Sequence, residues 1–214
     1  MRPFVVVLAG VNGAGKSSVG GALLRAHGLE WFNPDTMARA LMREAGMDRP
    51  EANARAWEHG RASLEAALGR GANFAFETTL GGATICSLLE QAGGTHDLLM
   101  LYCGLATPEL HIERVAQRVA HGGHPIEAAK IRERWITSRL NLIRLLPRLT
   151  HLQMFDNSVS VAAGEEIPDP LLILEMRGGR LRVPDPLDAA ALAAQPAWSR
   201  PIVEAAIQLA VRPG

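Results

Sequence analysis

The feature that most constrains this chain is a glycine-rich loop near its start, set between an apolar run and a helical stretch. Residues 3–9 (PFVVVLA) form a continuous valine-rich run, typical of a strand buried on both faces of a parallel sheet. Residues 10–17 (GVNGAGKS) then satisfy the pattern G-x-x-x-x-G-K-[ST] at every position, and residues 16–27 have helical character. Strand, loop and helix in this order predict the phosphate-binding loop of a nucleotide site.

Each residue type in the loop has a chemical reason. Glycine lets the backbone curl so that N–H groups point at phosphate oxygens, and the next helix offers its positive end to the same anion. Lys16 is one of only two lysines among 22 basic residues, so this chain uses Arg almost everywhere else. The Lys at this position therefore indicates a need for its compact point charge, because the wider guanidinium of Arg would not fit the loop. The hydroxyl of Ser17 suits Mg²⁺. We therefore predict ATP and Mg²⁺ as cofactors, with Ser17 as the metal ligand and a cofactor site made of Gly10, Asn12, Gly13, Ala14, Gly15, Lys16, Ser17 and Ser18.

Apolar runs alternate with stretches of helical periodicity along the next part of the chain. The predicted strands after the first are 29–33, 73–78, 97–105 and 152–155, and the predicted helices are 35–46, 50–70, 82–93, 107–121 and 125–146. Such alternation is typical of a parallel sheet with right-handed crossovers. The fold class predicted is α/β: a three-layer P-loop NTPase or kinase fold with a parallel, roughly five-stranded sheet.

The alternation weakens after residue 160. Residues 171–175 and 180–183 flank Arg177-Gly178-Gly179, which predicts a small hairpin, and residues 199–211 predict a last helix. We expect residues 1–160 to form a P-loop kinase core and residues 161–214 to form a C-terminal extension packed on the same domain.

Composition narrows the partners and the compartment. The formal net charge is zero and the pI is about 7.1, which lacks the basic excess that nucleic-acid or membrane partners demand. No apolar run reaches the ~18 residues needed to span a bilayer. The two scattered thiols, Cys86 and Cys103, favour a reduced compartment over a disulfide framework. The expectation is a cytoplasmic protein with no nucleic-acid and no membrane partner.

Two further strand ends carry candidate functional groups, because ligands bind at the carboxyl edge of open α/β sheets. Asp35 follows Asn33-Pro34 and could take a proton from a substrate hydroxyl or touch the Mg²⁺ shell; the alternative is a helix cap. Glu77 and Thr79 follow the strand at 73–78 and could orient substrate hydroxyls; the alternative is ordinary strand termination.

A basic segment follows at residues 111–134. Arg118 and Arg134 flank a Gly122-Gly123 hinge and could close over the transferring phosphoryl group, although charged residues at helical spacing usually form a solvated face. His121 and His124 bracket the glycines and are interpreted as loop or substrate contacts. Residues 156–158 (DNS) lie where an adenine-contacting loop would, but a bare turn is the simpler interpretation.

Taken in series, several segments resemble the zeta-toxin-like P-loop kinases, in particular a small, compact branch of that family. The resemblance covers about residues 3–160 and rests on the loop at 10–17, NPD at 33–35, FETTLGG at 76–82, RVAQRVAHGGH at 114–124, IRERW at 131–135 and DNS at 156–158. Zeta toxins transfer the γ-phosphate of ATP to the 3′-hydroxyl of UDP-N-acetylglucosamine. Residue 133 in IRERW is Glu where a further basic residue is expected, and nothing after residue 160 matches.

The resemblance implies a role for each matching residue. Asp35 is the general base, Lys16 and Ser17 hold ATP and Mg²⁺, and Arg118 and Arg134 are lid arginines. The acceptor site would be lined by Asp35, Arg61, Glu77 and Thr79. An antitoxin protein is the partner that the family suggests, beside a small-molecule hydroxyl acceptor.

The leading hypothesis is thus an ATP- and Mg²⁺-dependent phosphotransferase acting on a hydroxyl of a small molecule. The alternative is a nucleotide-dependent ATPase or switch that acts through a protein partner. A protein of that class is expected to have an apolar strand that ends in Asp-Glu, and the most similar strand end in this sequence is Glu77-Thr78.

Overall fold

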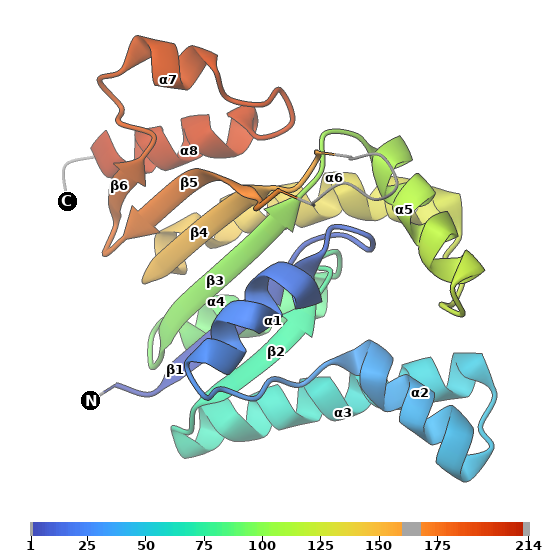
Figure 1. The fold of residues 1–214 in the computed structure, drawn as a ribbon. Helices are drawn as coiled ribbons and strands as arrows, with labels where there is room; N and C mark the ends of the chain where they lie inside the picture. Colours follow the sequence, from blue (N-terminus) through green and yellow to red (C-terminus); the bar gives the residue numbers. More distant parts are fainter. Residues whose placement is uncertain (1, 160–167, 212–214) are drawn as a thin grey trace.

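A computed structural model describes residues 2–159 and 168–211 of the protein. The described residues form one six-stranded sheet with helices on both faces (Figure 1). The strands are β1 (Phe4–Ala9), β2 (Phe74–Thr78), β3 (Asp97–Gly104), β4 (His151–Asp156), β5 (Leu171–Arg177) and β6 (Arg180–Val183), in the spatial order β2-β1-β3-β4-β5-β6. Neighbours among the first four strands pair in parallel, whereas β5 and β6 are antiparallel.

The central strand β1 is buried on both faces, which explains its unbroken apolar sequence. Val5 and Val7 belong to the large core on one face of the sheet, while Val6 and Leu8 pack on the other face. Alternate side chains of a strand point to opposite faces, so a strand covered on both sides has no polar position to spare.

Helices complete a three-layer architecture, as the sequence predicts. They are α1 (Lys16–Ala26), α2 (Pro34–Ala45), α3 (Arg49–Arg70), α4 (Ala83–Ala92), α5 (Pro108–Ala120), α6 (Ala128–Leu145), α7 (Ala189–Ala193) and α8 (Arg200–Val211), with a 3₁₀ turn at Leu146–Arg148. Leu24 of α1 packs on one face of the sheet, whereas α3, α4, α6 and α8 contribute buried side chains to the core on the other. α2 and α3 form a hairpin at the β2 edge (Figure 1).

The predicted strand at 29–33 is reduced to a single parallel bridge between Phe32 and Phe76. Phe32 N–H donates to the Ala75 carbonyl, and the Phe32 carbonyl accepts from Glu77 N–H. The next two residues cannot continue this pairing, because Pro34 has no N–H and already occupies the first turn of α2.

The C-terminal hairpin predicted from the sequence is present and extends the main sheet. β5 pairs with β4, and a tight turn through Gly178 and Gly179, both with positive φ, leads into β6. α8 then packs beside α6, with Ile202 and Ala206 fully buried in the large core. The short helix α7 lies in a stretch where the sequence predicts no element. No helix within the described ranges is long and apolar enough to cross a membrane.

Candidate active site

The carboxyl ends of the parallel strands meet at one edge of the sheet, where the chain carries its candidate chemistry. The connection from β1 leads toward β2 on one side, and β3 lies on the other side of β1, so the strand order reverses at β1. Open α/β sheets bind ligands at such a reversal. The glycine-rich loop leaves β1 at this point.

The loop has the backbone conformation of an anion-binding nest. Gly15 precedes α1 in a left-handed conformation (φ 87°, ψ 19°) and offers no side-chain cap. The first N–H groups of α1 therefore remain available for an anion. A side chain at Gly15 would also displace Asn157, because its Cβ would lie 2.5 Å from Asn157 Nδ2.

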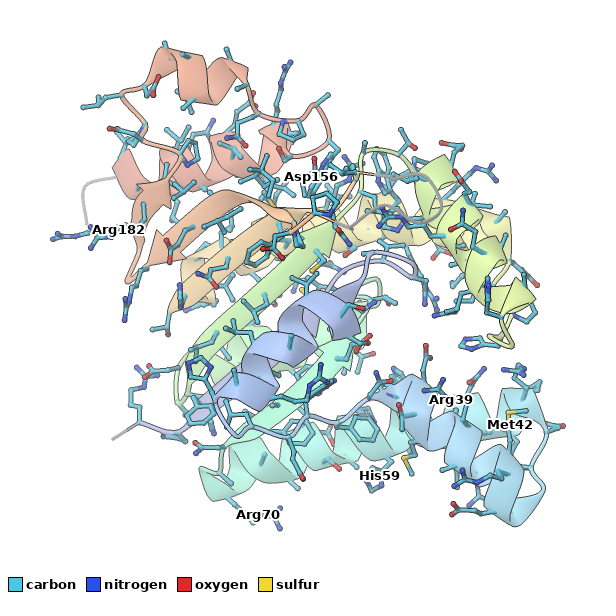
Figure 2. All side chains as sticks on the ribbon, in the orientation of Figure 1. Arg39, Met42, His59, Arg70, Asp156 and Arg182 are labelled. Carbon is cyan, nitrogen blue, oxygen red and sulfur yellow. The ribbon has the colours of Figure 1, made fainter. Side chains whose placement is uncertain are left out.

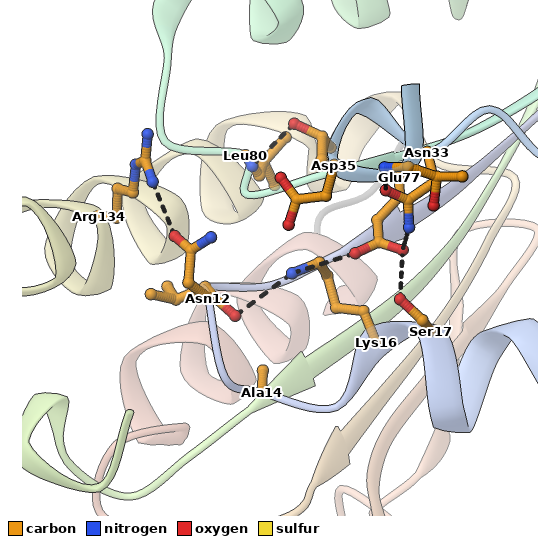
Figure 3. Close-up of polar contacts among 12 residues, drawn as sticks. Asn12, Ala14, Lys16, Ser17, Asn33, Asp35, Glu77, Leu80 and Arg134 are labelled. Carbon is orange, nitrogen blue, oxygen red and sulfur yellow. Dashed lines mark hydrogen bonds and ion pairs between the residues drawn. The ribbon is translucent and has the colours of Figure 1, made fainter. Parts of the chain in front are cut away.

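Glu77 contacts both polar side chains at the end of the loop, those of Lys16 and Ser17 (Figure 3). Its carboxylate lies 3.6 Å from Lys16 Nζ, accepts from Ser17 Oγ at 2.7 Å and accepts from Asn33 Nδ2 at 2.9 Å. Lys16 is only 7% exposed, and the Glu77 side chain 12%. The register that pairs Leu8 with Glu77 sets this carboxylate beside the start of the loop. Its contacts are thus with the nucleotide-binding loop, although it also borders the predicted acceptor region.

These residues fit the cofactors predicted from the sequence. Mg²⁺ takes one or two protein oxygens and keeps other positions for water and phosphate oxygens, so a serine hydroxyl beside a carboxylate suits it. Ser17 and Glu77 supply that pair. Lys16 and the free end of α1 are suited to phosphate oxygens.

Two cavities are lined by different residues of the loop. The larger, about 820 Å³, is lined by Gly13, Gly15 and Ser18 together with Gln117 and Asn157. The smaller, about 600 Å³, is lined among others by Asn12, Lys16, Asp35, Arg61, Glu77, Thr79, His124 and Arg134. The predicted catalytic and acceptor residues other than Arg118 thus share one cavity, and Ser18 faces the other.

Asp35 does not cap α2. The side chain of Asn33 accepts from Thr36 N–H at 3.2 Å, which makes Asn33 the cap and leaves the Asp35 carboxylate free of that role. That carboxylate lies 3.9 Å from both Arg118 Nη1 and His124 Nε2. Burial lowers the pKa of His124 and outweighs the opposite pull of Asp35. The candidate base therefore faces one permanent cation and one largely neutral imidazole.

Arg134 reaches the loop from α6. Its Nη1 donates to Asn12 Oδ1 at 2.8 Å, and burial lowers the pKa of the guanidinium. Arg118 approaches from α5, and its buried Nε has no hydrogen-bond partner among the described residues. One predicted lid arginine, Arg118, thus lies near Asp35, and the other, Arg134, contacts Asn12.

The remaining charged candidates have other partners. Arg61 forms ion pairs with Glu58 and Glu65 of its own helix. It lines the smaller cavity while its guanidinium is paired in this way. Arg132, two residues before Arg134 and not itself a candidate, is exposed and contacts Glu109 of α5 at 3.3 Å. His121 Nδ1 hydrogen-bonds the Gln117 carbonyl on α5 and contacts neither cavity.

Sequence reasoning missed His111. The residue is 1% exposed, and its Nδ1–H donates to the backbone carbonyl of Asn12 at 2.8 Å. Burial lowers its pKa to about 4, so the imidazole is neutral near pH 7. The sequence did contain a signal for its burial, because His111 lies on the same face of the predicted helix as the apolar Val115. A polar residue on a buried face needs a hydrogen-bond partner.

The Asp156–Ser158 segment is more than a bare turn. Asp156 lies at the end of β4 (Figure 2), where Oδ1 accepts from Ser158 N–H at 3.2 Å and from Trp198 Nε1 at 3.3 Å. This arrangement holds Asn157, whose Nδ2 donates to the Ala14 carbonyl at 2.9 Å. No local signal predicts a contact between residues so far apart in the sequence.

The fold and the site define a P-loop protein of the kinase-like class. A family model described as an AAA domain matches residues 5–142, which is most of the chain, and the protein belongs to that family. The resemblance to zeta-toxin-like P-loop kinases is confirmed at the level of the fold. No curated protein matches the chain in sequence.

Solved structures share this fold at low identity. The AvrRxo1-ORF1:ORF2 complex with ATP has a TM-score of 0.61 at 18% identity, covering 86% of this chain and 61% of that one. This chain thus spans about three fifths of that structure's chain. The PezAT chromosomal toxin–antitoxin system of Streptococcus pneumoniae has a TM-score of 0.54 at 16% identity, covering 72% of this chain and 68% of that one.

Proposed function

We propose that the protein is an ATP- and Mg²⁺-dependent phosphotransferase that phosphorylates a hydroxyl of a small molecule. The observation that carries the proposal is the cavity shared by Lys16 and Asp35, together with a second, larger cavity that is also lined by residues of the loop. One cavity is available for the nucleoside of ATP and the other for an acceptor, and the phosphate-binding loop borders both.

The site residues divide the work of transfer. The N-terminus of α1 and Lys16 would bind the phosphates of ATP, and Ser17 and Glu77 would hold Mg²⁺, which would neutralise phosphate charge. The acceptor oxygen forms a bond to the γ-phosphorus as the bond to the bridging oxygen of ADP breaks. The acceptor proton passes to Asp35, and Arg118 and Arg134 stabilise the charge on the transferring group.

Glu77 takes a different place in this proposal from the one its motif suggested. The resemblance assigns it to the acceptor, whereas its contacts with Lys16 and Ser17 favour a role in the metal shell. Glu77→Gln should weaken Mn²⁺ binding to the nucleotide complex about 10-fold, as other outer ligands of metal sites do. Unchanged Mn²⁺ affinity, measured by electron paramagnetic resonance, would return Glu77 to the acceptor side.

The experiment incubates the purified protein with ATP, Mg²⁺ and a panel of hydroxyl compounds, and detects a phosphorylated product by mass shift. UDP-N-acetylglucosamine belongs in the panel because of the zeta-toxin resemblance. Lys16→Ala should abolish transfer. Asp35→Asn should lower kcat about 10²- to 10⁴-fold, the usual contribution of a general base, while the Kd for ATP changes little.

A matched control is Glu44→Gln, an exposed carboxylate on the same helix as Asp35, which should keep the wild-type rate. Transfer at the wild-type rate by Asp35→Asn would exclude Asp35 as the base. ATP hydrolysis that needs a protein partner, with no acceptor phosphorylated, would favour the ATPase alternative. The toxin–antitoxin and two-chain structures of the same fold are the reason to test co-purifying proteins as antitoxins.

A further inference from the structure

The acceptor cavity, by which we mean the smaller one of about 600 Å³, has a charge distribution that restricts what it binds. Its basic lining residues are Lys16, Arg61, His124, Lys130 and Arg134, and its acidic ones are Asp35, Glu77, Glu127 and Glu133. The four permanent cations are equal in number to the four carboxylates, and burial keeps His124 largely neutral. The residues that line the cavity therefore carry no net charge between them, and the nearby Arg118 is paired with Asp35.

Most of these cations already have a carboxylate close by. Lys130 Nζ lies 2.9 Å from Glu133, and Arg61 contacts Glu58 and Glu65 on successive turns of α3. Each such pair is weak because it is partly exposed, but it cancels the field that a distant anion would feel. A phosphorylated or carboxylated acceptor would gain little from Lys130 or Arg61 unless it displaced their partners.

Arg134 is the exception, and its charge is directed at the nucleotide. No carboxylate lies within 4.0 Å of its guanidinium in the described part of the chain, and it donates instead to Asn12 in the phosphate-binding loop. With ATP bound, the γ-phosphate would face Arg134 and Lys16 and would add negative charge to the cavity. A second anion there would be repelled.

Four apolar side chains line the cavity. Trp57 of α3 is 47% exposed, whereas Phe32, Phe76 and Ile85 are more buried. An exposed tryptophan in a binding cavity offers a large rigid face for an apolar ligand surface at low conformational cost.

Apart from the carboxylates of Asp35 and Glu127, the polar groups left for the ligand are uncharged. The side chains of Asn53, Thr79 and Thr84 line the cavity and have no hydrogen-bond partner among the described residues. The N-terminus of α4 lies next to them at Gly82, where no side chain caps the helix. Amide, hydroxyl and backbone N–H groups of this kind match the hydroxyl groups of a ligand.

We propose that the phosphoryl acceptor is an uncharged polyhydroxyl compound with one apolar face, such as an unphosphorylated sugar or a nucleoside, which stacks on Trp57. This rests on the proposed function and narrows it. A phosphate-bearing sugar nucleotide, the acceptor implied by the zeta-toxin resemblance, is then a poor substrate because of its two extra anionic groups.

The test compares matched pairs: free sugars with their phosphates, and nucleosides with their nucleotides, each with ATP and Mg²⁺. We expect kcat/KM for the uncharged member to exceed that of its phosphorylated partner by at least about 10-fold. A preference for the phosphorylated member overturns the inference and leaves the phosphotransferase proposal intact. If no compound is phosphorylated, calorimetric binding with a non-hydrolysable ATP analogue decides, and failure of every uncharged compound to bind also overturns it.

Two variants examine the physical reasons separately. Glu58→Gln combined with Glu65→Gln removes the partners of Arg61, and should shift the preference toward the phosphorylated members about 10-fold. Trp57→Ala should raise the KM for the acceptor about 10-fold and change kcat less, with recovery in Trp57→Phe. Leu140→Ala, an exposed apolar residue of α6 outside the cavity, is the matched control. If the preference or the KM stays at the wild-type value in the corresponding variant, the assigned surface is wrong.

Discussion

At the residue scale, the site converges on Asn12, a position that the loop pattern leaves unspecified. Its backbone carbonyl accepts from His111 on α5, and its side-chain oxygen accepts from Arg134 on α6. One residue of the phosphate-binding loop is therefore hydrogen-bonded to both helices that carry the predicted lid arginines. A buried carbonyl that lost the His111 donor would be costly, because an unsatisfied buried acceptor costs about 1–3 kcal/mol.

His111 should make the protein sensitive to acid. Its pKa of about 4 in the folded state lies below the unfolded value, so the unfolded chain binds the extra proton first as the pH falls. Stability due to this group should decline from about pH 6.5 toward pH 4, by about 2 kcal/mol at pH 5. His111→Asn keeps an N–H donor without the titration and should lose less stability between pH 7 and pH 5 in urea unfolding.

His121→Asn, on the exposed end of the same helix, is the control and should keep the wild-type pH dependence. Equal losses in wild type and His111→Asn would show that the imidazole is not the group responsible. His111→Leu should be less stable than wild type and than His111→Asn at pH 7, because the Asn12 carbonyl then has no hydrogen-bond donor.

At the scale of elements, α6 separates two kinds of arginine by the face of the helix on which they lie. Arg134 turns inward to the loop, whereas Arg132 turns outward and pairs with Glu109 of α5. Two residues of separation along a helix are enough for this difference, since adjacent positions do not share a face. The helical conformation of α6 therefore decides that Arg134, and not Arg132, reaches the phosphate-binding loop.

Arg134→Ala should lower kcat by about 10³-fold with a small change in the thermal midpoint, because the lost group stabilises charge that develops during transfer. Arg132→Ala should stay within about twofold of wild type, as expected for an exposed ion pair. Rates from product formation and melting curves by circular dichroism separate the two effects. A similar loss in both variants would assign the effect to the helix instead of the Arg134 guanidinium.

At the scale of the whole molecule, the C-terminal elements complete the sheet and the core. β5 and β6 extend the sheet beyond β4, and Trp198 closes over Gly104 so tightly that a Cβ there would lie 2.1 Å from its ring. Trp198 also holds Asp156 beside the loop that contacts Ala14. We therefore propose that residues 168–211 fold together with the kinase core and support its active site.

Ile202→Ala should destabilise the entire molecule by about 2–4 kcal/mol, the usual cost of a large-to-small change at a fully buried site. Val211→Ala, 73% exposed near the end of the same helix, is the control and should change stability by less than about 0.5 kcal/mol. Urea unfolding followed by tryptophan fluorescence and by circular dichroism should show one shared transition. Two separate transitions would mean that the C-terminal part unfolds independently of the core.

The sequence by itself determined the phosphate-binding loop, the alternation of strands and helices and the C-terminal hairpin. These features depend on local chemistry: glycine where φ is positive, apolar runs in buried strands, and Pro or Gly at the ends of elements. Single residues and short periodic patterns carry that information directly. The run at 29–33 shows where such local prediction fails: it was predicted as a strand, but Pro34 stops the pairing after a single bridge.

The tertiary structure decided how the predicted groups meet. Pairing of β1 with β2 sets Glu77 against Lys16, and packing of α5 and α6 brings His111 and Arg134 to Asn12. Each of these contacts joins residues far apart in the chain, and its existence depends on strand order and helix packing that the whole core selects. The pairing of charges around the acceptor cavity is of the same kind, because a sequence shows which charges are present but not which of them lie together.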